Sequence, residues 1–156
     1  MQIRRAREQD IPGLGRLLYQ VQDVHAKGRP DLFRAGGKKY TDEELLTIIR
    51  DDERPIFVAV DETEKVLGYA FCIYEVQGDT PSVVGRKILY IDDLCVDEAC
   101  RGVHIGKALY AHVVETARAA GCYHITLNVW QLNESALHFY EACGLLPLKT
   151  MMEFVL

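Results

Sequence analysis

The sequence predicts an α+β protein in which a mixed, mostly antiparallel sheet carries helices on both faces. Three observations support this prediction: helical apolar spacing near the N-terminus, three consecutive strand-like segments in the middle, and a strand–helix–strand unit after them. The 156 residues, of which 49% are hydrophobic, suit one domain with a substantial core. We therefore expect a single domain spanning residues 1–156.

The N-terminal part predicts a short strand followed by a long helix. Gln2–Arg5 is the strand candidate. Asp10 stands at a helix N-cap, and Pro12 lies in the first turn, where its missing N–H does no harm. Apolar residues then recur at helical spacing: Ile11, Leu14, Leu17, Leu18, Val21 and Val24. The helix should end near Gly28.

A loop and a second, short helix follow. Gly28–Tyr40 contains glycine, proline and charged residues without any apolar period, so it is predicted to be a loop. Thr41 and Glu44 form a capping box, which marks the start of a helix. The apolar residues of that helix are Leu45, Leu46, Ile48 and Ile49.

The middle of the chain predicts an antiparallel meander. Pro55–Val60, Val66–Val76 and Lys87–Val96 are apolar runs rich in β-branched residues, with short polar loops between them. A helix follows and ends at Gly121. Its apolar face is formed by Ile105, Ala108, Leu109, His112, Val113, Thr116 and Ala120.

The C-terminal part predicts one more helix between two strands. His124–Trp130 reads as a strand, and because Ile88–Leu127 forms a right-handed crossover, this strand should run parallel to the preceding one. Asn133 can cap a helix that Gly144 closes. Leu148–Leu156 is predicted to be the final strand.

Composition excludes several classes of function. The net charge of −5 argues against a nucleic-acid partner, which requires a basic face, and an acidic surface favours a cationic one. No apolar stretch is long enough to span a bilayer, and nothing marks export, so we expect no membrane partner and a cytoplasmic protein. The five cysteines and five histidines lack metal-ligand spacing, so we expect reduced thiols and no metal site.

The most informative segment is Tyr90–Leu109, where a strand ends and a helix begins. A helix start offers unpaired N–H groups and partial positive charge, which suit a pyrophosphate. Gly102 and Gly106 let the backbone approach such an anion, and Arg101 and Lys107 add full charges. Neither the P-loop pattern nor the dinucleotide fingerprint is present, which disfavours a nucleotide-binding protein.

This segment resembles the pyrophosphate signature of the GNAT superfamily of N-acetyltransferases, Gln/Arg-x-x-Gly-x-Gly/Ala. Arg101, Ile105 and Gly106 match it in register, whereas His104 replaces its first glycine. Because His can adopt turn conformations that glycine usually fills, we expect the imidazole to point outward. A second stretch, Trp130–Leu145, resembles the family's N-x-x-A-x-x-F-Y-x-x-x-G-F/L segment. The resemblance covers nearly the whole chain.

The resemblance implies acetyl-coenzyme A as the cosubstrate, bound where two strands separate at their C-terminal ends. Asn133 is expected to contact the pantetheine arm as well as to cap its helix. A backbone N–H of Leu94 or Cys95 would stabilise the oxyanion. The residues expected to bind the coenzyme are Leu94, Cys95, Val96, Arg101, Gly102, Val103, His104, Ile105, Gly106, Lys107 and Asn133. Direct transfer in a ternary complex needs no acyl-enzyme, so no covalent role is expected for Cys95.

The resemblance also suggests the catalytic residues. Tyr140 is expected to be the general acid that protonates the departing thiolate. Strand alternation sends Asp92 and Asp93 to opposite faces, and a bulge would decide which one meets the acceptor. We choose Asp92 as the base because related members carry an acid there, although a charge that only attracts the acceptor explains it equally well.

The acceptor side should come from the first helix, the following loop and the last strands. Candidates for substrate binding are His25, Phe33, Asp93 and Asn128, with Asp31, Arg34 and Tyr40 also in the loop. Asn128 stands where some members that modify ribosomal-protein N-termini carry a glutamate, which disfavours a protein N-terminus as the acceptor.

The sequence therefore favours an N-acetyltransferase that acts on a primary amine, either a small molecule or a peptide. The alternative is a regulatory module of the same fold that binds acyl-coenzyme A without turnover. A longer acyl donor and a homodimer also stay open.

Overall fold

A five-stranded sheet forms the centre of the protein in a computed structural model that describes residues 1–156. The strands are β1 (Gln2–Arg5), β2 (Ile56–Val60), β3 (Val66–Gln77), β4 (Arg86–Val96) and β5 (His124–Leu127). They lie side by side in sequence order, and every pair is antiparallel except β4–β5, which is parallel. The predicted mixed, mostly antiparallel sheet is confirmed.

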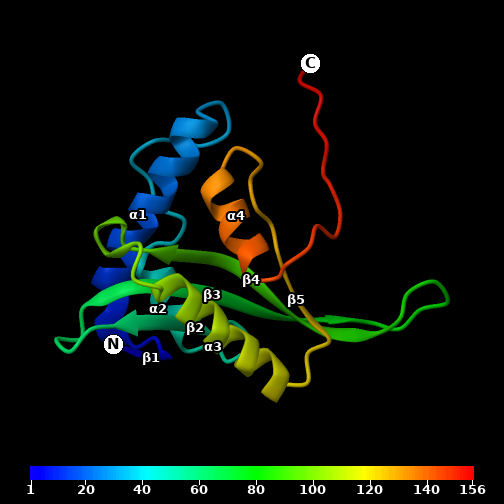
Figure 1. Ribbon diagram of the computed structural model, residues 1–156, viewed down its shortest axis with the longest axis horizontal. Coiled ribbons are helices and arrows are strands. Elements are labelled where there is room, and N and C mark those ends of the chain that lie inside the picture. Colours follow the sequence, from blue (N-terminus) through cyan, green and yellow to red (C-terminus); the bar gives the residue numbers. More distant parts are fainter.

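Helices cover both faces of this sheet (Figure 1). One face packs against α1 (Ile11–Gly28) and α2 (Asp42–Ile49), and the other packs against α3 (Ile105–Ala119). Alternating residues of the strands divide between the two cores: Val58 and Tyr69 face α1, whereas Ala59 and Ala70 face α3. The last helix, α4 (Glu134–Ala142), follows β5.

The predicted helix caps at Thr41 and Asn133 are confirmed by their local geometry. The Thr41 hydroxyl accepts a hydrogen bond from the Glu44 N–H at 3.2 Å, and the Glu44 carboxylate accepts one from the Thr41 N–H at 2.7 Å. Asn133 caps α4 by accepting from the Ala136 N–H at 3.2 Å. Two short 3₁₀ turns, Glu8–Asp10 and Glu98–Cys100, were not predicted. No helix combines the length and the apolar character that a membrane span requires.

The C-terminal part departs from the prediction in two places. β5 ends at Leu127, three residues before the predicted Trp130. The predicted final strand Leu148–Leu156 is wrong, because these residues adopt no regular structure and run away from the sheet (Figure 1). A strand requires a hydrogen-bonded neighbour, and this segment has none within the chain.

A buried ion pair joins the first strand to the start of α1. The Arg4 guanidinium donates two hydrogen bonds to the Asp10 carboxylate, at 2.7 and 3.0 Å, and their side chains are only 8% and 1% exposed. Asp10 occupies the expected N-cap position, but its side chain does not cap α1 and accepts instead from the Arg7 N–H at 2.7 Å. The guanidinium also pairs with Glu64, whose side chain is 47% exposed, so removing Asp10 would leave the buried charge with only this partly solvated partner.

We predict that Asp10→Ala lowers the free energy of unfolding by about 3–5 kcal/mol, because Arg4 would lose its buried partner. Urea unfolding followed by circular dichroism measures this loss. The matched control is Asp52→Ala, which removes a carboxylate that is 98% exposed and 3.5 Å from Arg5. Its effect should stay below about 0.5 kcal/mol, as for other surface pairs. Equal losses in the two variants would contradict a structural role for the buried pair.

Candidate active site

The sheet opens where β4 and β5 separate. β4 pairs with β3 up to Val96, but it pairs with β5 only from Ile88 to Ile91, opposite His124 to Leu127. From residue 92 to residue 96, β4 therefore has no strand partner on its β5 side. Such an edge offers backbone N–H and C=O groups to an extended ligand. Leu94, Cys95 and Val96, expected from the sequence to bind pantetheine, all lie along this edge.

A β-bulge in β4 lies at the start of the opening. The pairing with β3 shifts from Phe71 opposite Asp93 to Cys72 opposite Ile91, so Asp92 is the extra residue. A bulge inserts one residue and re-aims the neighbouring side chains. The strict alternation expected for Asp92 and Asp93 is therefore broken here.

The bulge brings both carboxylates to the face that α1 and α2 cover. The Tyr40 hydroxyl donates to Asp92 Oδ2 at 2.7 Å, and the Tyr69 hydroxyl donates to Asp93 Oδ2 at 2.8 Å. Both tyrosine rings pack against the ring of Phe71, with centroid distances of 5.5 and 4.9 Å. The expectation that the two side chains point to opposite faces is thus wrong, because the extra residue changes the register.

The two carboxylates differ in their electrostatic surroundings. Asp92 Oδ2 also lies 2.8 Å from the Lys39 ammonium, so this oxygen holds two donors. Burial raises the pKa of Asp93 to about 6, and the charge of Asp92 adds to this, while the hydrogen bond from Tyr69 opposes it. A carboxylate with such a pKa is suited to exchange protons near neutral pH.

Tyr140 is the only buried residue of α4. Burial raises the pKa of its hydroxyl, and the charge of Asp93 contributes to the rise. The hydroxyl is therefore protonated at neutral pH, and no hydrogen bond within the protein engages it. Tyr140 and Asp93 come from elements far apart in the sequence, and their electrostatic coupling indicates that the fold brings them together.

The turn before α3 is built around two left-handed residues. Gly102 has φ 84°, and His104, at the N-cap of α3, has φ 63°. The His104 side chain makes no capping hydrogen bond and is exposed, in agreement with the outward orientation expected from the sequence. A left-handed residue followed by helical ones turns successive N–H groups toward one side, which forms an anion-binding concavity. Around it, Arg101, Val103 and Lys107 are exposed.

Gly106 has a packing role that the sequence did not predict. A Cβ at this position would lie 3.3 Å from the ring of Phe139 and 3.4 Å from the side chain of Val96. The missing side chain thus lets the start of α3 approach α4 and the end of β4. Ile105 is buried beside it, which anchors the turn to the core.

Three aromatic rings pack together near the end of α1. His25, in the last turn of α1, packs against Phe33 at 5.0 Å, and Phe33 packs edge-on against Trp130 at 5.1 Å. Burial lowers the pKa of His25, with a smaller contribution from Lys39. These residues connect α1, its following loop and the segment after β5.

Three other candidates form no hydrogen bond or ion pair with Asp92 or Asp93. The Asn128 amide donates to the Tyr90 hydroxyl at 3.1 Å and is exposed. Asp31 forms an ion pair with Arg29 on the surface. The Arg34 backbone carbonyl accepts a hydrogen bond from the Gln22 side chain, whereas the Arg34 guanidinium forms no hydrogen bond. The sequence did not predict that Lys39 and Tyr69 contact the two carboxylates. Tyr69 could have been found, because the hydroxyl of a tyrosine on an inward-facing strand position usually needs a hydrogen-bond partner.

Cys95 is poorly suited to act as a nucleophile. Burial, with the charge of Asp93, raises the pKa of the Cys95 thiol to about 12, which disfavours a thiolate nucleophile. The thiol lies near the Leu17 carbonyl, on the α1 side of β4. No group of three His, Cys, Asp or Glu side chains is arranged to hold a metal ion.

Residues 18–145 match the family model described as the acetyltransferase (GNAT) family. A 60-residue segment is 40% identical to glucosamine 6-phosphate N-acetyltransferase of Trypanosoma brucei brucei, covering 38% of this chain and 39% of that protein. A 94-residue segment is 31% identical to streptothricin acetyltransferase of Streptomyces lavendulae, covering 60% of this chain and 46% of that protein. The chain thus matches less than half the length of either relative.

A crystal structure of a mutant of the BH1408 protein from Bacillus halodurans is similar over the whole chain. It is 33% identical, superposes with a TM-score of 0.96, and covers 100% of this chain and 99% of that one. The segment that matches the family model contains the opening of the sheet, the left-handed turn and α4. The chain therefore belongs to the GNAT family of acetyltransferases.

Proposed function

We propose that this protein is an N-acetyltransferase that moves an acetyl group from acetyl-coenzyme A to a primary amine by direct transfer in a ternary complex. One observation carries the proposal. The unpaired edge of β4 leads from the two carboxylates to the left-handed turn at the start of α3. Acetyl-coenzyme A has an extended thioester arm, which can pair with a free strand edge. It also has a pyrophosphate at the end of that arm, which can bind at a helix start.

The residues around the opening fit the coenzyme. The backbone of Leu94 and Val96 would pair with the pantetheine amides as a strand does, and Asn133 would contact the same arm from the start of α4. The N–H groups from Val103 to Gly106 would bind the pyrophosphate, with Gly102 giving the turn its shape. Arg101 and Lys107 would add charge.

The acceptor would enter from the side of Lys39 and Tyr40. Its ammonium would replace the Lys39 ammonium at Asp92, so Asp92 would touch the substrate directly. Asp93 would then take the proton, since its pKa of about 6 lies near neutral pH. This division of roles makes Asp92 the orienting carboxylate and Asp93 the stronger candidate for the base.

The remaining steps use backbone N–H groups and Tyr140. The free amine attacks the thioester carbonyl, and the N–H of Leu94 or Cys95 stabilises the oxyanion that forms. When the intermediate collapses, the C–S bond breaks and Tyr140 donates its proton to the departing thiolate. The extra proton on the new amide nitrogen then restores the Tyr140 hydroxyl, so the products are the amide, the free thiol and a protonated Asp93 carboxyl. No acyl-enzyme is required, which agrees with the high pKa of the Cys95 thiol.

The acceptor is proposed to be a small or peptide-borne primary amine with a cationic head. The carboxylate pair would attract it, and the rings of His25, Phe33 and Trp130 would offer an apolar wall behind it. Two relatives are named for a sugar phosphate amine and for streptothricin, both of which are small molecules. We also propose a cytoplasmic location, where thiols stay reduced.

The proposed function is tested by thiol release from acetyl-coenzyme A across a panel of polyamines, amino acids, amino sugars, aminoglycosides and peptide N-termini. Turnover with at least one amine is the expected result. Coenzyme binding in calorimetry without turnover on any amine would favour the alternative, a regulatory module of the same fold. Affinity for the coenzyme weaker than about 1 mM would defeat both hypotheses.

Tyr140→Phe should reduce kcat by about 10²–10⁴-fold, because it removes the proton donor while keeping the ring that fills the core. Coenzyme affinity, measured by calorimetry, should stay within a few-fold of the original. As a control, Tyr90→Phe removes a hydroxyl that only meets Asn128. Full turnover in Tyr140→Phe would end the assignment of this residue as the acid.

Below about pH 6, kcat/KM should fall with decreasing pH, because protonated Asp93 cannot accept a proton. Asp93→Asn should remove this limb of the profile together with most of the activity. An unchanged limb in Asp93→Asn would show that another group titrates there.

The same substitution should have an opposite effect on stability. Because burial raises the folded-state pKa above its ordinary value of 3.8, stability falls as the pH rises from about 4 to about 6. Asp93→Asn should therefore raise Tm at pH 7 and give no gain below pH 4. Thermal unfolding at both pH values measures this difference, and a Tm gain of equal size at both would contradict it.

His104→Val should weaken coenzyme binding and destabilise the fold by about 1–2 kcal/mol, because a β-branched residue resists the left-handed conformation. His104→Gly should preserve both properties, since glycine adopts φ 63° without strain. Calorimetry and urea unfolding of the pair provide the measurements. If the valine variant binds the coenzyme as tightly as the glycine variant, the turn is not part of the binding site.

A further inference from the structure

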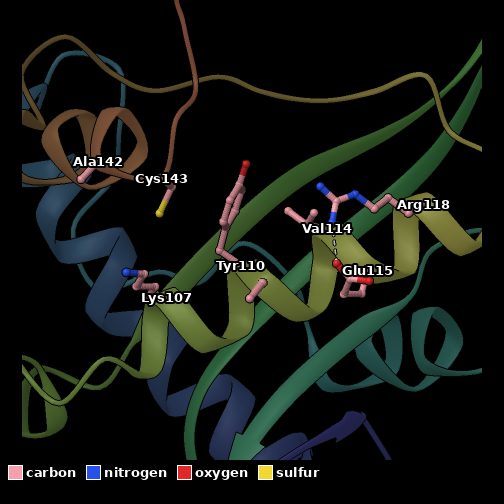
Figure 2. Close-up of a pocket in the computed structure, with 8 residues that line it drawn as sticks. Lys107, Tyr110, Val114, Glu115, Arg118, Ala142 and Cys143 are labelled. Atoms are coloured by element: carbon pink, nitrogen blue, oxygen red, sulfur yellow. Dashed lines mark hydrogen bonds and ion pairs between the residues drawn. The ribbon is translucent and has the colours of Figure 1, made fainter.

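Two pockets on the surface of this protein each contain an arginine, and they differ in whether an acid neutralises it. The first pocket lies between α3 and α4 and has a volume of about 450 Å³ (Figure 2). Its arginine, Arg118, forms an ion pair with Glu115 at 2.7 Å, which Figure 2 marks with a dashed line. This guanidinium already has an acid partner within its own helix.

The second pocket lies beside the proposed acceptor site. It has a volume of about 170 Å³ and is lined by Tyr40, Glu44, Thr47, Ile48 and Arg54. Arg54, just before β2, is half-buried and forms no ion pair with a carboxylate. The Glu44 carboxylate accepts instead from the Thr41 N–H, at 2.7 Å. A half-buried arginine that lines a pocket without an acid partner indicates an anionic ligand.

The sheet places Arg54 on the face that carries the two carboxylates. β2 and β3 keep one register before Ile56, because the Glu53 carbonyl accepts from the Tyr74 N–H at 2.8 Å. In this register Arg54 lies opposite Ile73, so their side chains share a face of the sheet. Phe71, two residues from Ile73 in β3, lies on that face in the core under α1 and α2. This is also the face toward which the bulge directs both acids.

One strand separates the arginine from the acids. Arg54 precedes β2, the acids lie in β4, and β3 runs between them. Their backbones are thus two strand spacings, about 10 Å, apart across the sheet. Ile73 lies between them, is half-buried and belongs to neither hydrophobic core. A small acceptor that lies across Ile73 therefore meets Asp92 at one end and Arg54 at the other.

Tyr40 connects the two ends of this site. Its hydroxyl donates to Asp92, and its ring centroid lies 6.0 Å from the Arg54 guanidinium and 5.5 Å from the Lys39 ammonium. When the acceptor ammonium replaces Lys39 at Asp92, as proposed above, Lys39 loses its acid partner too. Two cations without acid partners then lie beside one ring, which favours an anionic group on the acceptor.

We propose that the acceptor carries an acidic group, a carboxylate or a phosphate, in addition to its primary amine. The amine binds at Asp92, and the planar guanidinium of Arg54 donates to the acidic oxygens. Arg54 thereby determines which amines the protein prefers. This inference rests on the proposed acetyl transfer, and it narrows the acceptor from primary amines in general to amino acids or amino phosphates.

Matched pairs of acceptors test the proposal. Each pair contains a plain alkylamine and an amine of equal chain length that ends in a carboxylate or in a phosphate. At the best chain length, kcat/KM for the acidic member should exceed that for the plain amine by at least about tenfold, because only the acidic member engages Arg54. Comparison of the carboxylate series with the phosphate series shows which of the two groups the site takes.

Arg54→Gln should lower kcat/KM for the acidic acceptor by at least about tenfold and should leave the value for the plain amine within about twofold. The matched control is Arg50→Gln, which removes the same charge from an arginine just after α2 that is 65% exposed and pairs with Glu8. This control should keep the full preference. Circular dichroism should show that both variants stay folded.

Calorimetry gives a second readout that requires no turnover. In protein saturated with coenzyme A, the acidic acceptor should bind at least about tenfold more tightly than the plain amine, and Arg54→Gln should abolish the difference. The proposal is overturned if the original protein shows no preference, if the preference survives in Arg54→Gln, or if this variant weakens both members of a pair equally, as the loss of packing on Tyr40 would. Absence of turnover with every amine would instead defeat the proposed transfer, and the binding data would still decide whether Arg54 recognises an acidic group.

Discussion

The end of β4–β5 pairing at Ile91 is the constraint on which the rest of this structure depends. Had the parallel ladder continued, the backbone of residues 92–96 would be satisfied by β5, and no extended ligand could pair with it. The bulge at Asp92 lies directly after the last paired residue, and the left-handed turn follows a few residues beyond the strand. One region of the chain thus combines a free strand edge, two acidic side chains and a left-handed turn.

The same break sets the electrostatics of the site. Because the bulge directs both carboxylates toward the face under α1, Asp92 meets Lys39 and Tyr40, while Asp93 meets the buried Tyr69 in a partly buried position. Two neighbouring acids therefore acquire different properties, one from an ion pair and the other from burial. An unbroken strand would have separated them on opposite faces, and neither difference would have arisen.

The C-terminal segment shows why a correct pattern can yield a wrong element. Residues 148–156 alternate as a strand does, and the sequence predicts one, but the folded chain offers no edge that this segment reaches. β5 has an edge without a neighbour, and α4 is only partly covered. Local propensity specifies what a segment can form, whereas a hydrogen-bonded neighbour decides whether it forms.

The sequence by itself determined the order of the elements, the capping box at Thr41, the parallel crossover into β5 and the family, because these follow from apolar period, turn residues and two spaced motifs. It also identified His104 as the residue that departs from the signature. Only the tertiary structure decided where β5 ends, which residue forms the bulge, and that Lys39 and Tyr69 contact the acids. Those features arise from contacts between segments far apart in the chain, and no local pattern encodes the register or the burial that produces them.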